Sequence, residues 1–106
     1  MGADIMVVIY KKRNYVIYAT NKDKSYIVCN MNKDFSKGHT HIHNYNTAKY
    51  LINAALNFSV PPNSTSIYII DSLIRISKNK EYIQKLKVLK IKKKAKPKYR
   101  KNSRGR

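Results

Sequence analysis

The stretch that decides the fold is residues 46–62, which read NTAKYLINAALNFSVPP. Its apolar side chains recur at the spacing of one face of an α-helix, at Ala48, Leu51, Ile52, Ala55 and Leu56. Asn46 or Thr47 can cap the start of this helix. Val60 must leave helical geometry because a proline follows it. The stretch therefore predicts an amphipathic helix that packs one face against a core.

Three short β-strands are predicted before this helix. Runs rich in β-branched residues and tyrosine occupy residues 5–10, 15–20 and 26–29, and polar segments of turn length separate them. Strands joined by such short connectors pair as antiparallel neighbours. Residues 30–46 are polar, and we expect an ordered loop or a short irregular strand there.

A second helix is predicted after the Pro61-Pro62 break, starting at one of several possible caps in residues 63–66 and ending near Ser77. Its isoleucines and leucine cover most of the helix circumference, as in a central buried helix. Two strands broken at Asp71-Ser72 would fit the same run. We favour the helix.

A third helix is expected to begin after the cap residue Asn79 and to end near Ile91, where the apolar periodicity fades. Pro97 stops any helix that reaches it. We therefore divide the chain into a small α+β domain, residues 1–91, and a basic disordered tail, residues 92–106. The predicted fold class is α+β, with a small antiparallel sheet of about three strands followed by three helices and this tail.

The strongest functional signal is the positive charge of the last 22 residues. Lys85 to Arg106 hold twelve Lys or Arg and no acidic residue, in a chain of net charge +18. A segment this basic repels itself unless an anion lies against it, and the commonest such partner is a nucleic-acid backbone. The predicted contacts are Lys85, Lys87, Lys90, Lys92, Lys93, Lys94, Lys96, Lys98, Arg100, Lys101, Arg104 and Arg106, with Tyr99 able to stack on an unpaired base.

A secondary basic patch is predicted at Lys11, Lys12 and Arg13, in the first connector. Lys22 and Lys24 belong to the next connector, at the opposite end of the sheet, so one binding face through both connectors is not expected. Two alternatives for the basic tail are a solubilising role and binding to an anionic membrane or an acidic protein surface. The membrane alternative is weaker because residues 92–106 contain no Trp, Phe or Leu to insert.

The histidines His39, His41 and His43 alternate, so on a strand they project from one face. Three imidazoles could hold Zn²⁺, with Asp34 or Cys29 as a further ligand. However, same-face positions on a strand are about 7 Å apart, and no acidic residue lies close enough in sequence to orient the ligands. We expect a structural role for this cluster, with no metal and no cofactor.

Catalytic motifs are not found in the sequence. The five acidic residues are scattered, and neither a Ser-His-Asp or Cys-His arrangement nor a Gly-rich phosphate loop can be defended. We therefore expect a protein that is not an enzyme. The single Cys29 cannot form an internal disulfide, and no run approaches the roughly 18 apolar residues of a membrane span, so a cytoplasmic location is expected.

The segments GHTHI (38–42), AKYLI (48–52) and SLIRIS (72–77), with Tyr82, resemble small uncharacterised proteins of phages and mobile elements in low-GC bacteria. The resemblance covers about residues 14–90 and excludes the tail. It implies no activity, but such accessory proteins often act on host defence, for example as anti-CRISPR inhibitors.

The resemblance makes Arg75 a possible contact with guide RNA or with the nucleic-acid channel of a target complex. The alternative is an ion pair with Asp71, one helical turn earlier, and we favour that interpretation.

These observations favour an accessory protein that binds nucleic acid, with RNA or a ribonucleoprotein preferred over a defined duplex site. The alternative is a phage-type inhibitor of a host-defence complex, in which the helical body contacts a host protein and the tail only strengthens the contact. No membrane partner is expected, and the oligomeric state stays open.

Overall fold

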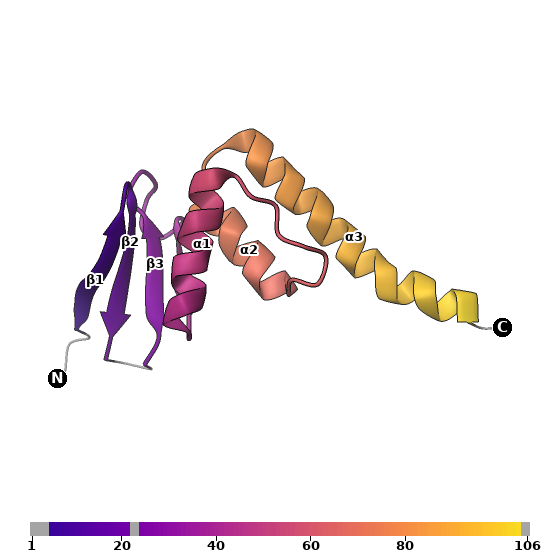
Figure 1. The fold of residues 1–106 in the computed structure, drawn as a ribbon, viewed down its shortest axis with the longest axis horizontal. Coiled ribbons are helices and arrows are strands. Elements are labelled where there is room, and N and C mark those ends of the chain that lie inside the picture. Colours follow the sequence, from indigo (N-terminus) through magenta and orange to yellow (C-terminus); the bar gives the residue numbers. More distant parts are fainter. Residues whose placement is uncertain (1–4, 22–23, 105–106) are drawn as a thin grey trace.

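A single antiparallel sheet, covered on one face by helices, forms the body of the protein (Figure 1). The computed structural model describes residues 5–21 and 24–104, with side chains through residue 94. In chain order the elements are β1 (Met6–Lys12), β2 (Tyr15–Thr20), β3 (Tyr26–Asn30), β4 (His39–Ile42), α1 (Tyr45–Asn57), α2 (Ile67–Ile76) and α3 (Lys80–Arg104). The strands lie in the sheet in the order of the sequence. The predicted α+β class is confirmed.

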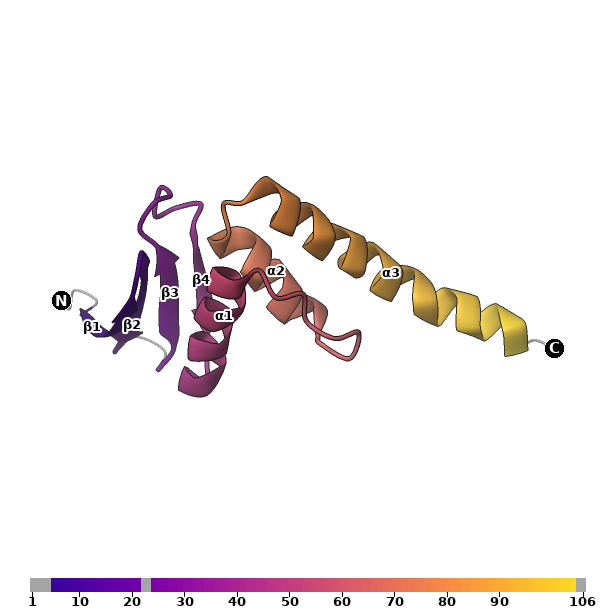
Figure 2. The ribbon, with the colours of Figure 1, turned by 45° about the horizontal axis from the view of Figure 1, so that its top comes forward.

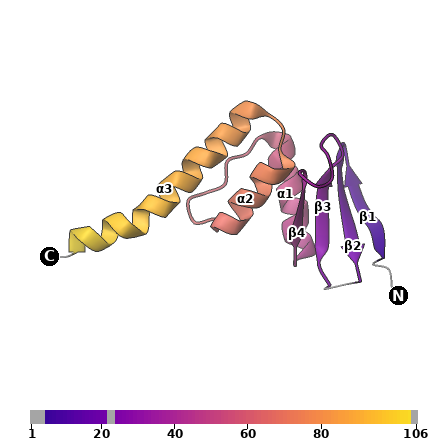
Figure 3. The same cartoon turned by 180° about the vertical axis from the view of Figure 1, so that it is seen from behind.

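The sheet has four strands in the described part of the chain, so the prediction of about three was one too few. The fourth, β4, pairs antiparallel with β3 and places Cys29 opposite His39. Figure 3, drawn from behind, shows β4 beside α2. The Thr40 hydroxyl lies 2.8 Å from the Ser72 hydroxyl of α2, and Ile42 is in the core. Burial against α2 therefore stabilises a strand that the polar sequence of this segment did not clearly indicate.

The connection between β1 and β2 is a tight turn, shorter than the predicted connector. Lys12 pairs with Tyr15, which leaves Arg13-Asn14 as the two turn residues. Arg13 has a φ of 57°, as the first position of a two-residue hairpin turn requires. Lys11 and Lys12 are consequently strand residues and do not belong to a loop.

The helix α1 begins at Tyr45 because Asn44 caps it, with its Oδ1 accepting a hydrogen bond from the Thr47 backbone N–H at 2.9 Å. The predicted caps, Asn46 and Thr47, lie in the first turn instead. The predicted apolar stripe is confirmed, since four of its members, Ala48, Leu51, Ile52 and Ala55, are buried and Leu56 is partly buried against the core.

The core lies between the sheet and the helices α1 and α2 (Figure 2). The strands contribute Tyr15, Ile17, Val28 and Ile42, and α2 contributes Ile70, Leu73 and Ile76. The segment that could have formed two strands is therefore a helix, as favoured. Burying one side chain of this size contributes about 1.5–3 kcal/mol to the stability of the fold. The buried residues of α2 therefore fix its position against the sheet. α2 in turn provides the surface on which α3 packs.

The first turns of α3 pack on the body through the buried side chains of Tyr82, Leu86 and Leu89. The predicted cap is confirmed, because Asn79 Oδ1 accepts from the Tyr82 backbone N–H at 2.9 Å. Farther along, α3 projects away from the body (Figure 1). Its backbone stays helical through Pro97 to Arg104, where the sequence predicts disorder. Lys, Arg and Ala are strong helix formers, so a helix that is already nucleated can continue.

The length of α3 does not make it a membrane segment. It contains 25 residues, but lysines are distributed along it from Lys80 to Lys101. In the described part of the chain, no helix is both long enough and apolar enough to cross a membrane.

Candidate nucleic-acid interface

Exposed lysines form two rows along the first half of α3. Lys85 and Lys92 are seven residues apart, as are Lys87 and Lys94, and seven residues are close to two helical turns. Each pair therefore lies on one side of the helix, and all four side chains are exposed. We name them the Lys85 row (Lys85 and Lys92) and the Lys87 row (Lys87 and Lys94). The buried stripe of α3 consists of Tyr82, Leu86 and Leu89, and the two rows lie on opposite sides of it.

Two of the predicted contacts are already engaged within the protein. Lys90 Nζ lies 2.7 Å from Asp71 Oδ1, and Lys93 Nζ donates to the backbone oxygen of Asn63. Among residues whose side chains are described, Lys90 and Asp71 form the only ion pair. Both partners are partly exposed, and such a surface pair contributes about 0–1 kcal/mol. These contacts attach α3 to the body, whereas the lysines of the two rows form no ion pair with an acidic side chain among the described residues.

The remaining predicted contacts lie toward the end of α3. Its helical backbone carries Lys96, Lys98, Tyr99, Arg100, Lys101 and Arg104, whereas Arg106 lies outside the described residues.

Arg75 does not pair with Asp71, so the favoured interpretation of this residue was wrong. Its Nε donates to the backbone oxygen of His39 at 2.8 Å, and its Nη2 donates to that of Ser36 at 3.4 Å. Asp71 meets Lys90 instead, because α3 packs along α2. Arg75 therefore holds the β3–β4 loop against α2.

A cluster of cations that the sequence did not indicate lies where the β3–β4 loop meets the end of α2. Lys33 Nζ donates to the backbone oxygens of Arg75 and Ser77, at 2.8 and 3.0 Å. Lys78 Nζ donates to the backbone oxygen of Asn32 at 3.2 Å. Burial, and then the charges of Arg75 and Lys78, lower the pKa of Lys33. The two lysines are isolated in the sequence and come together only through the fold.

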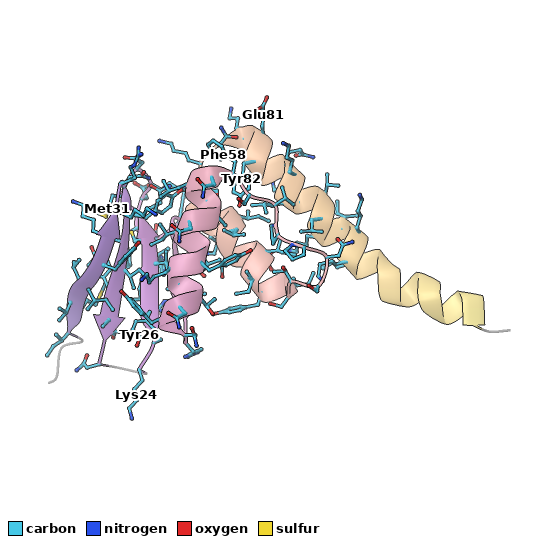
Figure 4. All side chains as sticks on the ribbon, in the orientation of Figure 1. Lys24, Tyr26, Met31, Phe58, Glu81 and Tyr82 are labelled. Carbon is cyan, nitrogen blue, oxygen red and sulfur yellow. The ribbon has the colours of Figure 1, made fainter. Side chains whose placement is uncertain are left out.

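The predicted secondary patch of Lys11, Lys12 and Arg13 lies at the same end of the body as this cluster. The β1–β2 turn, the β3–β4 loop, the end of α1 and the start of α3 all gather at the top of Figure 1, and we name this region the loop end. Lys12 Nζ donates to Asn53 Oδ1 at 2.7 Å, which ties the patch to α1. Lys24 lies at the opposite end of the sheet, as predicted (Figure 4).

The histidines are arranged differently from a metal site. His39 and His41 share one face of β4 with ring centroids 5.2 Å apart, and His43 lies beyond the strand. His39 Nδ1 is 2.6 Å from the backbone oxygen of Phe35. The rings of Phe35 and His39 are stacked, with their centroids 4.4 Å apart. Within the described ranges, no three His, Cys, Asp or Glu side chains are placed to hold a metal ion. Cys29 of β3 lies opposite His39 of β4, and burial raises the pKa of its thiol.

The chemistry that these surfaces offer is the binding of a polyanion. Lysine ammonium groups donate charge-assisted hydrogen bonds to phosphate oxygens, and the two rows present four such groups with no acidic partner among the described side chains. Comparison of the chain with protein-family models, curated proteins and solved structures finds no match.

Proposed function

We propose that the protein is a cytoplasmic accessory protein that binds nucleic acid, RNA or a ribonucleoprotein in preference to a defined duplex site, and that it is not an enzyme. The observation that carries this proposal is the pair of exposed lysine rows on α3. Lysines that neutralise phosphates release condensed counterions, which gives affinity with little dependence on sequence. The packed first turns of α3 fix these rows relative to the body.

The preference for unpaired segments, such as the loops of RNA, over a defined duplex site rests on the aromatic residue within the basic segment. Tyr99 lies on the α3 backbone among the distal Lys and Arg residues. Aromatic side chains stack on the unpaired bases of loops and single strands, which a regular duplex does not offer. The cations of the loop end extend the basic surface beyond α3.

The test is a salt series of binding measurements with single-stranded RNA, single-stranded DNA and duplex DNA. The full chain is compared with a chain that ends at Ile91. This truncation retains the buried anchors Tyr82, Leu86 and Leu89, so the body keeps its packing. We expect affinity of the full chain to fall steeply with salt and the shortened chain to lose most binding. Absence of binding by the full chain, or equal binding by both, would refute the proposal.

A second candidate function, inhibition of a host-defence complex by protein contact, is favoured by β1. This edge strand lies farthest from the helices (Figure 2), and the five apolar residues 5–9 are each between 41% and 58% exposed. An exposed edge strand can pair with a strand of another protein. The contact with the host protein would then lie on the edge of the sheet, whereas the sequence analysis placed this contact on the helical body.

The two candidate functions are separated by inhibition of a purified CRISPR effector loaded with guide RNA. DNA cleavage is measured with the full chain, with the chain ending at Ile91 and with Val8→Lys. Inhibition that survives truncation but is lost in Val8→Lys supports protein contact through β1. Inhibition that is lost on truncation and kept in Val8→Lys supports the nucleic-acid proposal, and no inhibition by any chain excludes this target for both.

A further inference from the structure

A recess with a volume of about 210 Å³ opens at the loop end. Its lining includes four asparagines, Asn14, Asn30, Asn32 and Asn79, together with Phe58 and Lys78. Pockets for drug-sized ligands are about 300–1,000 Å³, so this recess suits a smaller planar polar group. It lies directly before the first turn of α3, where the basic segment begins.

The wall of the recess is fixed, but several polar groups remain available. Asn30 makes three side-chain hydrogen bonds, because its Nδ2 donates to the Ile76 backbone oxygen and its Oδ1 accepts from Asn14 Nδ2 and from the Asn32 backbone N–H. The Oδ1 of Asn14 and the side-chain amide of Asn32 have no hydrogen-bond partner among the described residues. Ser77 also lines the recess, and although it is only 2% exposed, its Oγ has no partner within the same part of the chain.

Phe58 adds an aromatic ring at the mouth of the recess, held in an unusual conformation. It follows α1 with a φ of 52°, in the left-handed region. The Ser59 N–H bonds the Ala54 oxygen and the Phe58 N–H bonds the Ala55 oxygen, which is the arrangement that normally has glycine at this position. Phe58 is 55% exposed, and the centroid of its ring lies 5.7 Å from that of Tyr82 (Figure 4). A strained, exposed aromatic residue is more typical of a binding site than of packing.

Cations surround the recess. Lys78 and Lys80 are exposed beside it, and Lys12 and Arg13 line a neighbouring hollow that shares Leu56 with it. Two acidic residues lie close in sequence, Asp34 after Asn32 and Glu81 after Asn79, but neither lines the recess, and Glu81 projects outward from the top of α3 (Figure 4). The surroundings therefore favour phosphate groups on either side of whatever occupies the recess.

We propose that the recess binds one unpaired nucleobase of a single-stranded nucleic acid, an inference that rests on the proposed function. Phe58 stacks on the base. The free Oδ1 of Asn14 and the free side-chain amide of Asn32, with the Ser77 hydroxyl, bond its Watson–Crick edge, because together they supply both donors and acceptors. Lys78 and Lys80 contact the adjoining phosphates. A base in a duplex cannot enter, because its edge is paired and its faces are stacked.

The test is the substitution Phe58→Gly, which removes the ring and relieves the backbone strain. Binding is measured by fluorescence anisotropy with a labelled single-stranded RNA, the DNA strand of the same sequence, and a blunt RNA duplex. Loss of one stacked base weakens single-strand binding about 5- to 150-fold, while duplex affinity is unchanged. Phe58→Tyr is the matched control and keeps single-strand affinity within about twofold of the unsubstituted chain, because its ring stacks equally well.

The outcomes separate this inference from the proposed function. If the unsubstituted chain binds neither single strands nor duplex, the proposed function fails. If it binds both, and Phe58→Gly leaves the ratio of the two affinities unchanged, the charged surface binds but the recess does not, and only the inference is overturned. Thermal unfolding first checks that the Phe58→Gly chain is folded, which the second conclusion requires.

Discussion

Replacement of one lysine row at a time tests how α3 meets a nucleic acid. The double variants are Lys85→Gln with Lys92→Gln, and Lys87→Gln with Lys94→Gln. All four side chains are exposed and lie outside the buried stripe, so both variants should retain the stability of the parent chain. The rows face opposite sides of the helix, and a single strand that runs along α3 can follow only one of them.

The expected size of the effect follows from counterion release. Each phosphate contact on a single strand contributes about 0.7 to the slope of log affinity against log salt, so two lost contacts lower the slope by about 1.4. At 0.1 M salt this corresponds to roughly 25-fold in affinity, or about 1.9 kcal/mol. We expect this loss for the row that faces the strand and a much smaller loss for the other row.

The assay is fluorescence anisotropy of a labelled single-stranded RNA across a series of salt concentrations. Replacing the same four lysines by arginine is the matched control, because it keeps the charge and should keep the slope. Lys90→Gln is a second control, since Lys90 is paired with Asp71 and its loss should leave the slope nearly unchanged. An unchanged slope in both double variants would show that the proximal half of α3 does not touch the strand.

Three further predictions concern stability and the helix. Asn30→Ala removes three hydrogen bonds and leaves the Ile76 oxygen without its donor, so urea unfolding should show a loss of about 3 kcal/mol; an effect near zero would contradict the buried network. Burial raises the pKa of Tyr82, so the unfolded chain releases this proton first and stability falls as the pH rises above about 10. Tyr82→Phe should reduce that alkaline loss and cost about 1 kcal/mol at neutral pH, because the bond to Ser59 is lost; thermal melts across pH test both effects. Pro97→Ala removes an interior proline penalty of about 3 kcal/mol, but because α3 is already helical on both sides of Pro97, the helix content by circular dichroism should stay nearly unchanged; a large rise would contradict a helix through this position.

Elements with a strong local signal were predictable from the sequence. The stripe of α1 and the cap at Asn79 depend on side chains a few positions apart, and the structure confirms both. The strand β4 lacked such a signal, because it has only two inward positions, Thr40 and Ile42, with histidines on the alternate positions. Its pairing is stabilised by contact with α2, about 30 residues farther along the chain.

The predicted interface was only partly accessible to sequence reasoning. Charge density identified α3, but the partner of Asp71 depends on how α3 packs along α2, which no local pattern encodes. The recess was missed for the same reason, since Asn14, Asn32 and Lys78 lie in three separate connections. Phe58 gave no sequence signal, because the sequence predicts a helix that continues almost to Val60, and only the observed end of α1 at Asn57 puts this phenylalanine where a glycine would be favoured.

The two proposed contacts, the lysine rows and the recess, respond differently to salt. Phosphate contacts along α3 weaken as salt rises because less is gained from counterion release, and they act on single strands and duplexes alike. Stacking of a base on Phe58 is not an ionic interaction and acts only on an unpaired base. The preference for single strands over duplex should therefore grow as salt is raised, even while both affinities fall.

Charge alone accounts for part of this growth in preference. For each phosphate contact, the slope of log affinity against log salt is about 0.9 for a duplex and about 0.7 for a single strand, so duplex binding falls faster as salt rises. That part persists in Phe58→Gly, since the substitution removes no cation. The ratio of single-strand affinities between the parent chain and Phe58→Gly thus isolates the recess, and it should stay nearly constant across the salt series. A ratio that falls toward one at high salt would instead show that Phe58 acts through the charged surface, because only the ionic contacts weaken in that range.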